Sequence, residues 1–244
     1  MNKKKIALIT GANKGIGLET ARQLGQQNTT VLLGARDSRK GETAAEKLRK
    51  EGIDAHPIVV DVSDPESIRK AAIQVEGDFG HLDILVNNAG VMTDERTKKV
   101  SEQSLETWRE TFATNVFGLI ATTNAFLPLL RKSEAGRIVN LSSILGSIEF
   151  HAKPGSPIYE SKDTPAYNVS KAAVNAYTVQ LAHELKDTKI KVNAAHPGWV
   201  KTDMGGEGAV MEIEDGAKTS VALATLGADG PNGAYLHMGK PLPW

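Results

Sequence analysis

The alternation of short apolar runs with longer amphipathic segments is the feature of this sequence that most constrains its fold. Six runs rich in β-branched or apolar residues are expected as strands, and a seventh candidate lies near the end: 6–10, 30–35, 55–60, 84–87, 137–141, 191–196 and 234–236. Amphipathic segments occupy 16–27, 39–51, 65–79, 105–130 and 166–186. Strands separated by helices of this length predict βαβ units, right-handed crossovers and a parallel sheet.

We therefore predict an α/β fold: a single doubly wound Rossmann-type domain, residues 1–244, around a central, mostly parallel, seven-stranded sheet. In such sheets, ligands bind beyond the carboxyl ends of the strands. The chain shows no internal repeat and no interdomain linker. Two segments with little periodicity, 145–165 and 204–210, are expected as loops, and long irregular segments inside a domain are often functional.

Charge and residue content exclude several classes of function. Lys plus Arg equals Asp plus Glu, at 29 each, so no long-range field attracts nucleic acid or an anionic membrane. There is no cysteine, and the six histidines show no ligand spacing, so we expect neither disulfides nor a metal site. The apolar run behind the basic start is too short for a signal peptide, and no run approaches the ~18 apolar residues of a membrane span. A cytoplasmic protein is expected.

A glycine-rich turn directly follows the first predicted strand and opens the first amphipathic segment. Glycines let the backbone turn sharply and approach a pyrophosphate, while the helix N-terminus offers unpaired N–H groups and the positive end of its dipole. The alternative is a plain strand-to-helix turn, but the position after the first strand of a βαβ series favours a dinucleotide site. The cofactor contacts predicted in this turn are Gly11, Asn13, Lys14, Gly15, Ile16 and Gly17.

The end of the second predicted strand, Gly34-Ala35-Arg36-Asp37, indicates which dinucleotide binds. An acidic residue at this place holds the free ribose of NAD, whereas a guanidinium pairs with the 2′-phosphate of NADP. Arg36, together with Lys14 in the glycine turn, favours NADP(H). The alternative is that both cations are solvated and that Asp37 binds the ribose.

Tyr167 and Lys171 are four residues apart at the start of a predicted helix, so their side chains share one face. Thr164 and Pro165 supply a cap and a first-turn proline. Free tyrosine has a pKa of about 10, and a neighbouring ammonium group with a cationic nicotinamide would lower it. Tyr167 could then act as a general acid or base. The alternative for such a pair is an ordinary helix surface.

The presence of several such motifs in one fixed order along the chain favours the functional reading of each of them over the structural one. The glycine turn is followed by Asp61-Val62, Asn87-Asn88-Ala89-Gly90, Asn115, Ser143 at the end of the fifth strand, Tyr167 with Lys171, and Pro197-Gly198. With this set the chain resembles the short-chain dehydrogenase/reductase family from Lys5 to about Leu236. Within the family it is most similar to the NADPH-dependent carbonyl reductases, on the residues 11–18, 35–37 and 196–204.

The resemblance implies roles for the matching positions. Tyr167 is implied as the acid/base, and Lys171 as the residue that holds the nicotinamide ribose and lowers the tyrosine pKa. Ser143 is implied to orient the carbonyl, and Asn115 to hold a water in a proton relay. The other implied cofactor contacts are Asp61 and Val62 at the adenine, Asn88, Ala89 and Gly90 along the cleft, and Pro197, Gly198, Val200 and Thr202 around the nicotinamide. Family members deliver hydride directly to the carbonyl carbon, without a metal.

The substrate side is expected to be apolar. Trp199 and Met204 are the candidate wall residues beside Ser143 and Tyr167, so the predicted partner is a small-molecule carbonyl compound. The segment 145–165 is interpreted as an insertion. It contains Phe150, His151 and Tyr159, which either fold over the mouth of the site or pack within the loop. An insertion here is associated in carbonyl reductases with a monomer, and we expect a monomer or dimer rather than a tetramer.

Other functions on the same fold were weighed. The same groups could work mainly in reverse, as an NADP-dependent alcohol dehydrogenase. A non-catalytic NADPH-binding sensor would be expected to have lost Ser143, Tyr167 or Lys171, and all three are present. Epimerases and dehydratases on this fold mostly carry larger substrate domains, for which this chain has little room.

Overall fold

A computed structural model describes residues 4–244 and places eight strands in one sheet. The order across the sheet is β3-β2-β1-β4-β5-β6-β7-β8, and all neighbours are parallel except the last pair. The strands are β1 (Lys5–Thr10), β2 (Thr29–Ala35), β3 (Ala55–Val59), β4 (Ile84–Asn87), β5 (Arg137–Leu141), β6 (Lys191–Ala195), β7 (Tyr235–His237) and β8 (Lys240–Pro241).

The connections between parallel strands are mainly helical. The longer helices are α1 (Gly15–Gln26), α2 (Ser38–Lys50), α3 (Pro65–Phe79), α4 (Leu105–Phe112), α5 (Leu119–Leu130), α7 (Pro165–Glu184) and α8 (Ile213–Ala224). Short helical turns occur at η1 (Val100–Glu102), η3 (Ile144–Gly146) and α6 (Ile148–Ala152). A π-helical segment, Ala113–Gly118, joins α4 to α5.

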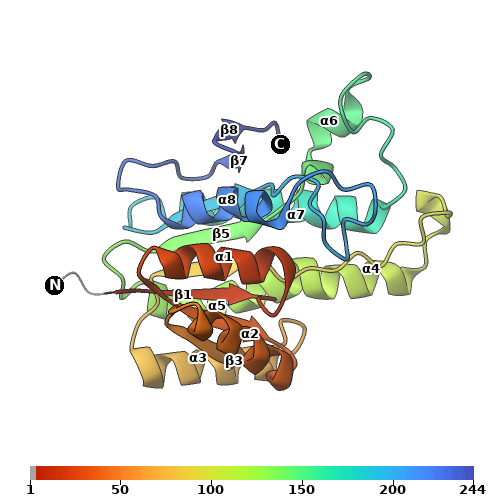
Figure 1. Ribbon diagram of the computed structural model, residues 1–244. Coiled ribbons are helices and arrows are strands. Elements are labelled where there is room, and N and C mark those ends of the chain that lie inside the picture. Colours follow the sequence, from red (N-terminus) through yellow and green to blue (C-terminus); the bar gives the residue numbers. More distant parts are fainter. Residues whose placement is uncertain (1–3) are drawn as a thin grey trace.

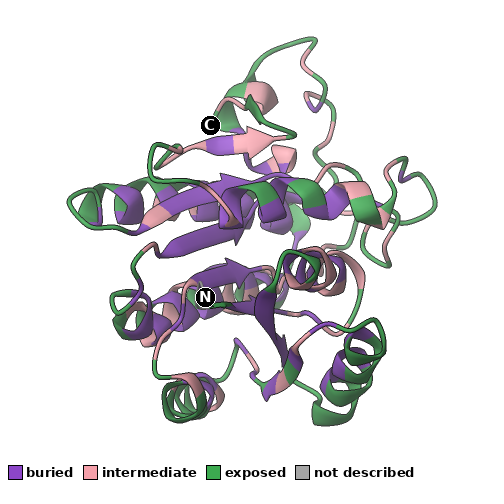
Figure 2. Ribbon diagram, turned by 60° about the vertical axis from the view of Figure 1, so that its left-hand side comes forward, coloured by how far each residue is buried: buried purple, intermediate pink, exposed green. Residues whose placement is uncertain are grey.

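The helices cover the sheet on both faces, which gives three layers (Figure 1). One apolar core lies under α1, α2 and α8 and includes Leu24, Leu48 and Val221. The other lies under α3, α5 and α7 and includes Phe126 and Leu181. Figure 2 shows the central strands buried while the outer helix faces are exposed. Strands buried on both faces explain why β1, β2 and β4 are continuous apolar runs in the sequence.

The predicted doubly wound α/β fold with a mostly parallel sheet is confirmed, but the predicted count of seven strands is wrong. The eighth strand, β8, pairs antiparallel with β7 through a two-residue turn. Met238 and Gly239 form this turn with φ of 47° and 77°, the left-handed conformation that short hairpins require. Two strand residues are too few to show an alternating pattern.

Two further expectations need correction. The segment before β7 contains helix α8, for which we predicted no element. The segment 145–165, expected to be irregular, carries the short helices η3 and α6.

The stretch Leu105–Leu130 also differs from expectation. It forms one continuous helical run of 26 residues, and its most apolar 18-residue window has a mean hydropathy of 1.3. Length and composition alone would suffice for a membrane span, although we expected no such stretch. Half of its most apolar window is buried, and Phe126 and Leu130 lie fully inside the core beneath the sheet. Buried core helices pass the same test, so the stretch is accounted for by packing within the fold.

Candidate active site

The glycine-rich turn lies at the carboxyl end of β1, next to the point where the strand order reverses between β1 and β4. Gly11 and Gly15 have φ of 65° and 56°, which glycine adopts without strain. Gly17 packs so closely that an added Cβ would lie 2.5 Å from Asn88 Nδ2. Within the described residues, no side chain caps the N-terminus of α1, so its first N–H groups remain for another acceptor.

Two residues hold this turn against the end of β4. Asn88 donates from Nδ2 to the carbonyl oxygens of Thr10 and Gly11 at 2.7 and 3.2 Å. The hydroxyl of Thr10, which the sequence did not single out, accepts from the N–H groups of Asn88 and Ala89 at 3.0 Å. Asn88 therefore shapes the glycine turn, while Ala89 and Gly90 continue along the same edge.

The charged residues near the end of β2 differ in whether they already have a partner. Asp37 caps α2 by accepting from the N–H groups of Arg39 and Lys40 at 2.9 and 3.1 Å, and these bonds lower its pKa. Arg36 is exposed and has no ion-pair partner among residues 4–244. Lys14 pairs with Asp203 from the loop after β6. The carboxylate nearest to Arg36 in sequence is thus committed to a helix N-terminus.

A shallow hollow lies beside this charged end of α2. Asn13 and Leu18 line it on one side, and Arg39, Lys40 and Lys47 line it on the other. The sequence analysis did not include Arg39 and Lys40 as candidate anion ligands, although they come two and three residues after Asp37 and add positive charge where the helix begins.

Tyr167 and Lys171 share one face of α7, as their spacing predicted. Both are buried, with exposed fractions of 7% and 4%. The Lys171 Nζ lies 5.5 Å from the centre of the Tyr167 ring and donates to the carbonyl oxygen of Leu141, at the end of β5, at 2.7 Å. The pair is therefore not an ordinary surface pair.

Burial shifts the pKa values of both groups. It raises the pKa of Tyr167 to about 12, which is opposite to the lowering that the sequence predicted, and a hydrogen bond with the Ser143 side chain partly opposes the rise. It lowers the pKa of Lys171 to about 8. Buried ionisable groups without a counter-charge are costly, and such pairs gather at functional sites.

Ser143 follows β5 and precedes η3, beside α7. Its Oγ accepts from the Leu145 N–H at 3.2 Å, and the same side chain makes the hydrogen bond with Tyr167. An added Cβ on Gly146 would lie 2.7 Å from the backbone of Lys171, so this turn packs directly on α7. The structure thus brings Ser143, Tyr167 and Lys171 together.

The start of α7 is capped differently from the prediction. Thr164 gives no side-chain bond to the helix N-terminus and instead bonds Asn168 at 3.0 Å. Asp94, from the segment after β4, accepts from the N–H groups of Ala166 and Tyr167 at 2.6 and 3.1 Å. A cap from a distant segment leaves no local signal in the sequence. Asp94 therefore positions the backbone of Tyr167.

Asn115 lies buried in the π-helical segment and joins two elements of the site. Its Oδ1 accepts from the Val91 N–H at 2.8 Å, and its Nδ2 donates to the Val91 carbonyl and to Ser170 Oγ at 2.9 and 3.0 Å. Next to this segment, an added Cβ on Gly118 would lie 2.5 Å from the Val62 carbonyl oxygen. The Asp61 carboxylate accepts from Ser63 within its own turn.

The segment after β6 lies across from the glycine turn. An added Cβ on Gly15 would lie 3.5 Å from Thr202 Cγ2, so the two turns are neighbours. Gly198 has φ of 92°. Val200 is buried and forms an isolated parallel β-bridge with Met211. Pro197 precedes this turn.

The two predicted substrate residues are partly exposed. Trp199 donates from Nε1 to the Gly205 carbonyl at 2.8 Å, and an added Cβ on Gly208 would lie 2.7 Å from its ring. Its indole thus lies against the loop that contains Met204.

The polar and aromatic residues of the insertion make contacts within it. His151 bonds the carbonyl of Leu145 at 2.9 Å, and its Nδ1 lies 3.1 Å from Lys162 Nζ. Lys162 also lies 5.2 Å from the Tyr159 ring centre. At the other end, the Glu149 N–H donates to the backbone oxygen of Trp244 at 3.0 Å. Of the two roles expected for His151 and Tyr159, these contacts favour packing within the loop over covering the mouth of the site.

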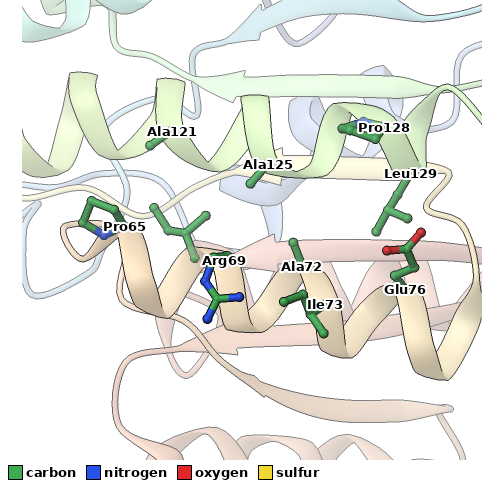
Figure 3. Close-up of a pocket in the computed structure, with 10 residues that line it drawn as sticks. Pro65, Arg69, Ala72, Ile73, Glu76, Ala121, Ala125, Pro128 and Leu129 are labelled. Atoms are coloured by element: carbon green, nitrogen blue, oxygen red, sulfur yellow. The ribbon is translucent and has the colours of Figure 1, made fainter.

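A separate apolar groove of about 370 Å³ lies between α3 and α5 (Figure 3). Ile73, Ala121 and Ala125 line it, with Arg69 and Glu76 at its polar side. Its lining includes none of the predicted site residues. The candidate active site is therefore the cluster at the carboxyl ends of the strands and not this groove.

Known proteins resemble this chain over almost its whole length. A family model of short chain dehydrogenases matches residues 5–212. The short-chain dehydrogenase anuI of Penicillium roqueforti (strain FM164) is 42% identical over 233 residues, covering 92% of this chain and 90% of that protein. Carbonyl reductase (NADPH) 1 of Mus musculus is 33% identical over 281 residues, covering 99% of each.

A solved structure shows the same similarity. The NADPH-bound carbonyl reductase from chicken fatty liver matches with a TM-score of 0.86 at 29% identity, covering 99% of this chain and 100% of that chain. The family expected from the ordered motifs is confirmed: the chain belongs to the short-chain dehydrogenase/reductase family.

Proposed function

We propose that this protein is an NADPH-dependent oxidoreductase that reduces aldehydes or ketones to alcohols by direct hydride transfer, with Tyr167 as the general acid. The observation that carries the proposal is the buried pair of Tyr167 and Lys171, with the Ser143 side chain hydrogen-bonded to the tyrosine. Burying an amine and a phenol without a counter-charge costs stability, which favours a functional reason for them.

The residues at the strand ends fit NADPH. The uncapped start of α1 offers N–H groups to a pyrophosphate. Arg36 and Lys14, with Arg39 and Lys40 nearby, supply positive charge for the 2′-phosphate, and Asp37 is occupied by α2. The two carbonyl reductases similar to this chain carry NADPH in their names. When bound, NADPH supplies the hydride.

The remaining cofactor contacts are assigned from the positions of the residues at the carboxyl ends of the strands. Asp61 and Val62 border the adenine. Asn88, Ala89 and Gly90 line the cleft, with Asn88 acting through the glycine turn that it holds. Pro197, Gly198, Val200 and Thr202 surround the nicotinamide. Trp199 and Met204 form an apolar wall for the substrate.

The chain's own groups divide the proton chemistry. Ser143 donates its hydroxyl proton to the carbonyl oxygen and orients it. Tyr167 gives its phenolic proton to the same oxygen as the alcohol forms. Lys171 binds the nicotinamide ribose, and its charge stabilises the phenolate left behind. Because Val91 and Ser170 use both amide protons of the Asn115 side chain, a relay water at Asn115 binds to an oxygen atom of this residue.

The direct test is NADPH oxidation, followed by absorbance, across aldehydes, aryl ketones, ketoesters and quinones. We expect turnover with at least one class and a product alcohol confirmed by chromatography. The same preparation with NADP⁺ and the product alcohol measures the reverse reaction, since the same groups serve both directions. A protein that binds NADPH but reduces none of these carbonyl classes would refute the proposal and favour the sensor alternative.

A further inference from the structure

His196 follows β6 and lies buried between two turns of the candidate site, with an exposed fraction of 7%. Its Nδ1 accepts from the Ile144 N–H at 3.2 Å and from the Gly198 N–H at 3.3 Å. Ile144 directly follows Ser143, and Gly198 belongs to the segment assigned to the nicotinamide. One ring nitrogen therefore binds the backbone of both turns, which are more than 50 residues apart in the sequence.

These bonds fix the state of the ring. Nδ1 can accept only with its lone pair free, so the proton of the neutral imidazole is on Nε2. Burial, with a smaller effect of His237, lowers the pKa of His196 to about 3, so the ring stays neutral around neutral pH. His237 has the opposite tautomer, because its Nδ1 bonds the His196 carbonyl at 2.9 Å, and the two rings lie 4.8 Å apart.

The Gly198 turn has little freedom to move by itself. Gly198 has φ of 92°, and an added Cβ there would meet Met211 Sδ at 2.0 Å and His237 Cε1 at 3.2 Å. The serine turn is equally confined, because Gly146 packs on the backbone of Lys171. The two turns follow paired strands, and the Ser142 N–H donates to the Ala195 carbonyl at 2.8 Å where that pairing ends. Beyond this point, the bonds to His196 Nδ1 connect the two turns.

We propose that His196 is a positioning residue that sets the spacing between the Ser143 turn and the Gly198 turn. It thereby sets how the substrate carbonyl faces the nicotinamide. This inference rests on the proposed function, because the Gly198 turn is assigned to the nicotinamide there. Hydride transfer is sensitive to such placement, since a misplacement of about 1 Å can cost about 100-fold in rate.

Two substitutions of His196 distinguish the effect of losing the Nδ1 hydrogen-bond acceptor from the effect of losing the volume of the ring. His196→Leu keeps apolar bulk and removes the acceptor, and we expect kcat to fall by about 10- to 100-fold, with KM for NADPH changed much less. His196→Asn keeps an acceptor atom at the δ position, and it should recover most of the lost kcat. His183→Leu, at an exposed position on α7, is the matched control and should leave kcat unchanged.

A second measurement does not depend on activity. Amide hydrogen exchange of Ile144 and Gly198, read by NMR, should accelerate in His196→Leu and remain slow in the wild type and in His196→Asn. Unchanged exchange in His196→Leu would overturn the inference, whatever the activity. Faster exchange with unchanged kcat would also overturn it, as would an equal loss of kcat in the Leu and Asn variants. An inactive wild-type protein would instead refute the proposed function.

Discussion

Single residues in the candidate site are held in ionisation states that suit their proposed work. With its pKa raised to about 12, Tyr167 keeps its proton at neutral pH, as a general acid must before it acts. Lys171, with its pKa lowered to about 8, is only just charged at the same pH. The charge of Lys171 is thus the more pH-sensitive of the two near neutrality.

Replacing Tyr167 with phenylalanine removes the hydroxyl and keeps the ring. We expect turnover to fall by about 10²- to 10⁴-fold, the usual contribution of a general acid, while NADPH affinity changes little. The measurement is turnover on an active ketone, with NADPH binding followed by fluorescence. Retention of more than about a tenth of the activity in a folded, NADPH-binding variant contradicts the proposed role of Tyr167.

The buried Lys171 predicts a pH-dependent stability. Its pKa is about 8 in the folded protein and 10.5 when exposed, so between these values the unfolded chain holds more protons. The free energy of unfolding should therefore rise with pH in this window, and from pH 7.5 to 9.5 the Lys171 contribution is about 2 kcal/mol. Urea unfolding without cofactor measures it. Lys171→Met is the control, and an equal pH slope in both proteins would disprove the shift.

Arg36 is expected to discriminate between the two nicotinamide cofactors. Arg36→Ala removes a charge-assisted hydrogen bond, worth about 1.5–3 kcal/mol, from the 2′-phosphate only. We expect kcat/KM with NADPH to fall about 10- to 100-fold, while the value with NADH changes little. Steady-state kinetics with each cofactor measure this. Equal efficiency with both cofactors in the unmutated protein would show that Arg36 does not select NADPH.

At the level of elements, the capping of α7 links folding to the site. Asp94→Ala removes the cap from the turn that carries Tyr167, which should lower the free energy of unfolding by about 1 kcal/mol. We expect turnover to fall as well, because the backbone N–H of Tyr167 loses its hydrogen bond to the Asp94 carboxylate. Denaturant unfolding and turnover are measured together.

Ser104→Ala is the matched control for this helix cap. Ser104 caps α4 through the Thr107 N–H at 3.0 Å, and it is not one of the residues assigned to the site. It should cost a similar amount of stability and leave turnover unchanged. If both variants lost turnover equally, the effect of Asp94 would be a general loss of stability rather than positioning.

Elements with a clear apolar pattern could be predicted to within two residues, and α3 was predicted at its observed bounds. Helix α8 was missed for a physical reason. Its buried face consists largely of small residues, including Gly216, Ala217, Thr219 and Ser220, so few large apolar side chains mark that face in the sequence. The short helix α6 and strand β8 are likewise too brief for any period to be visible.

The proximity of the candidate catalytic residues could be predicted because they follow fixed places on strands and helices. Ser143, Tyr167 and Lys171 meet where the sequence placed them. The contacts of Asp94, Thr10 and His196 could not be predicted, because each acts on backbone groups of segments distant in the sequence. Any aspartate, threonine or histidine can make such bonds, and only the folded arrangement shows which ones do.

At the scale of the whole molecule, the assembly state remains a prediction. The insertion runs from Leu145 to Pro165, beside the start of α7, where it should hinder pairing through this helix. We expect a monomer or a dimer in light scattering, and the same substrate panel should give a changed profile after residues 154–162 are shortened. A stable tetramer would contradict the first expectation, and an unchanged substrate profile would contradict the second.

The strand order also has a consequence for how the chain is made. Of the eight strands described, β1 is synthesised before the others, yet one of its two neighbours is β4, at Ile84–Asn87. Until that segment leaves the ribosome, the apolar strand Ile6–Thr10 has one edge without a partner, and such edges recruit other chains. Parallel pairing across long separations is also slow. Nascent chains that stall before residue 84 should therefore be the most aggregation-prone species during expression, and slower synthesis at low temperature should raise the yield of folded protein.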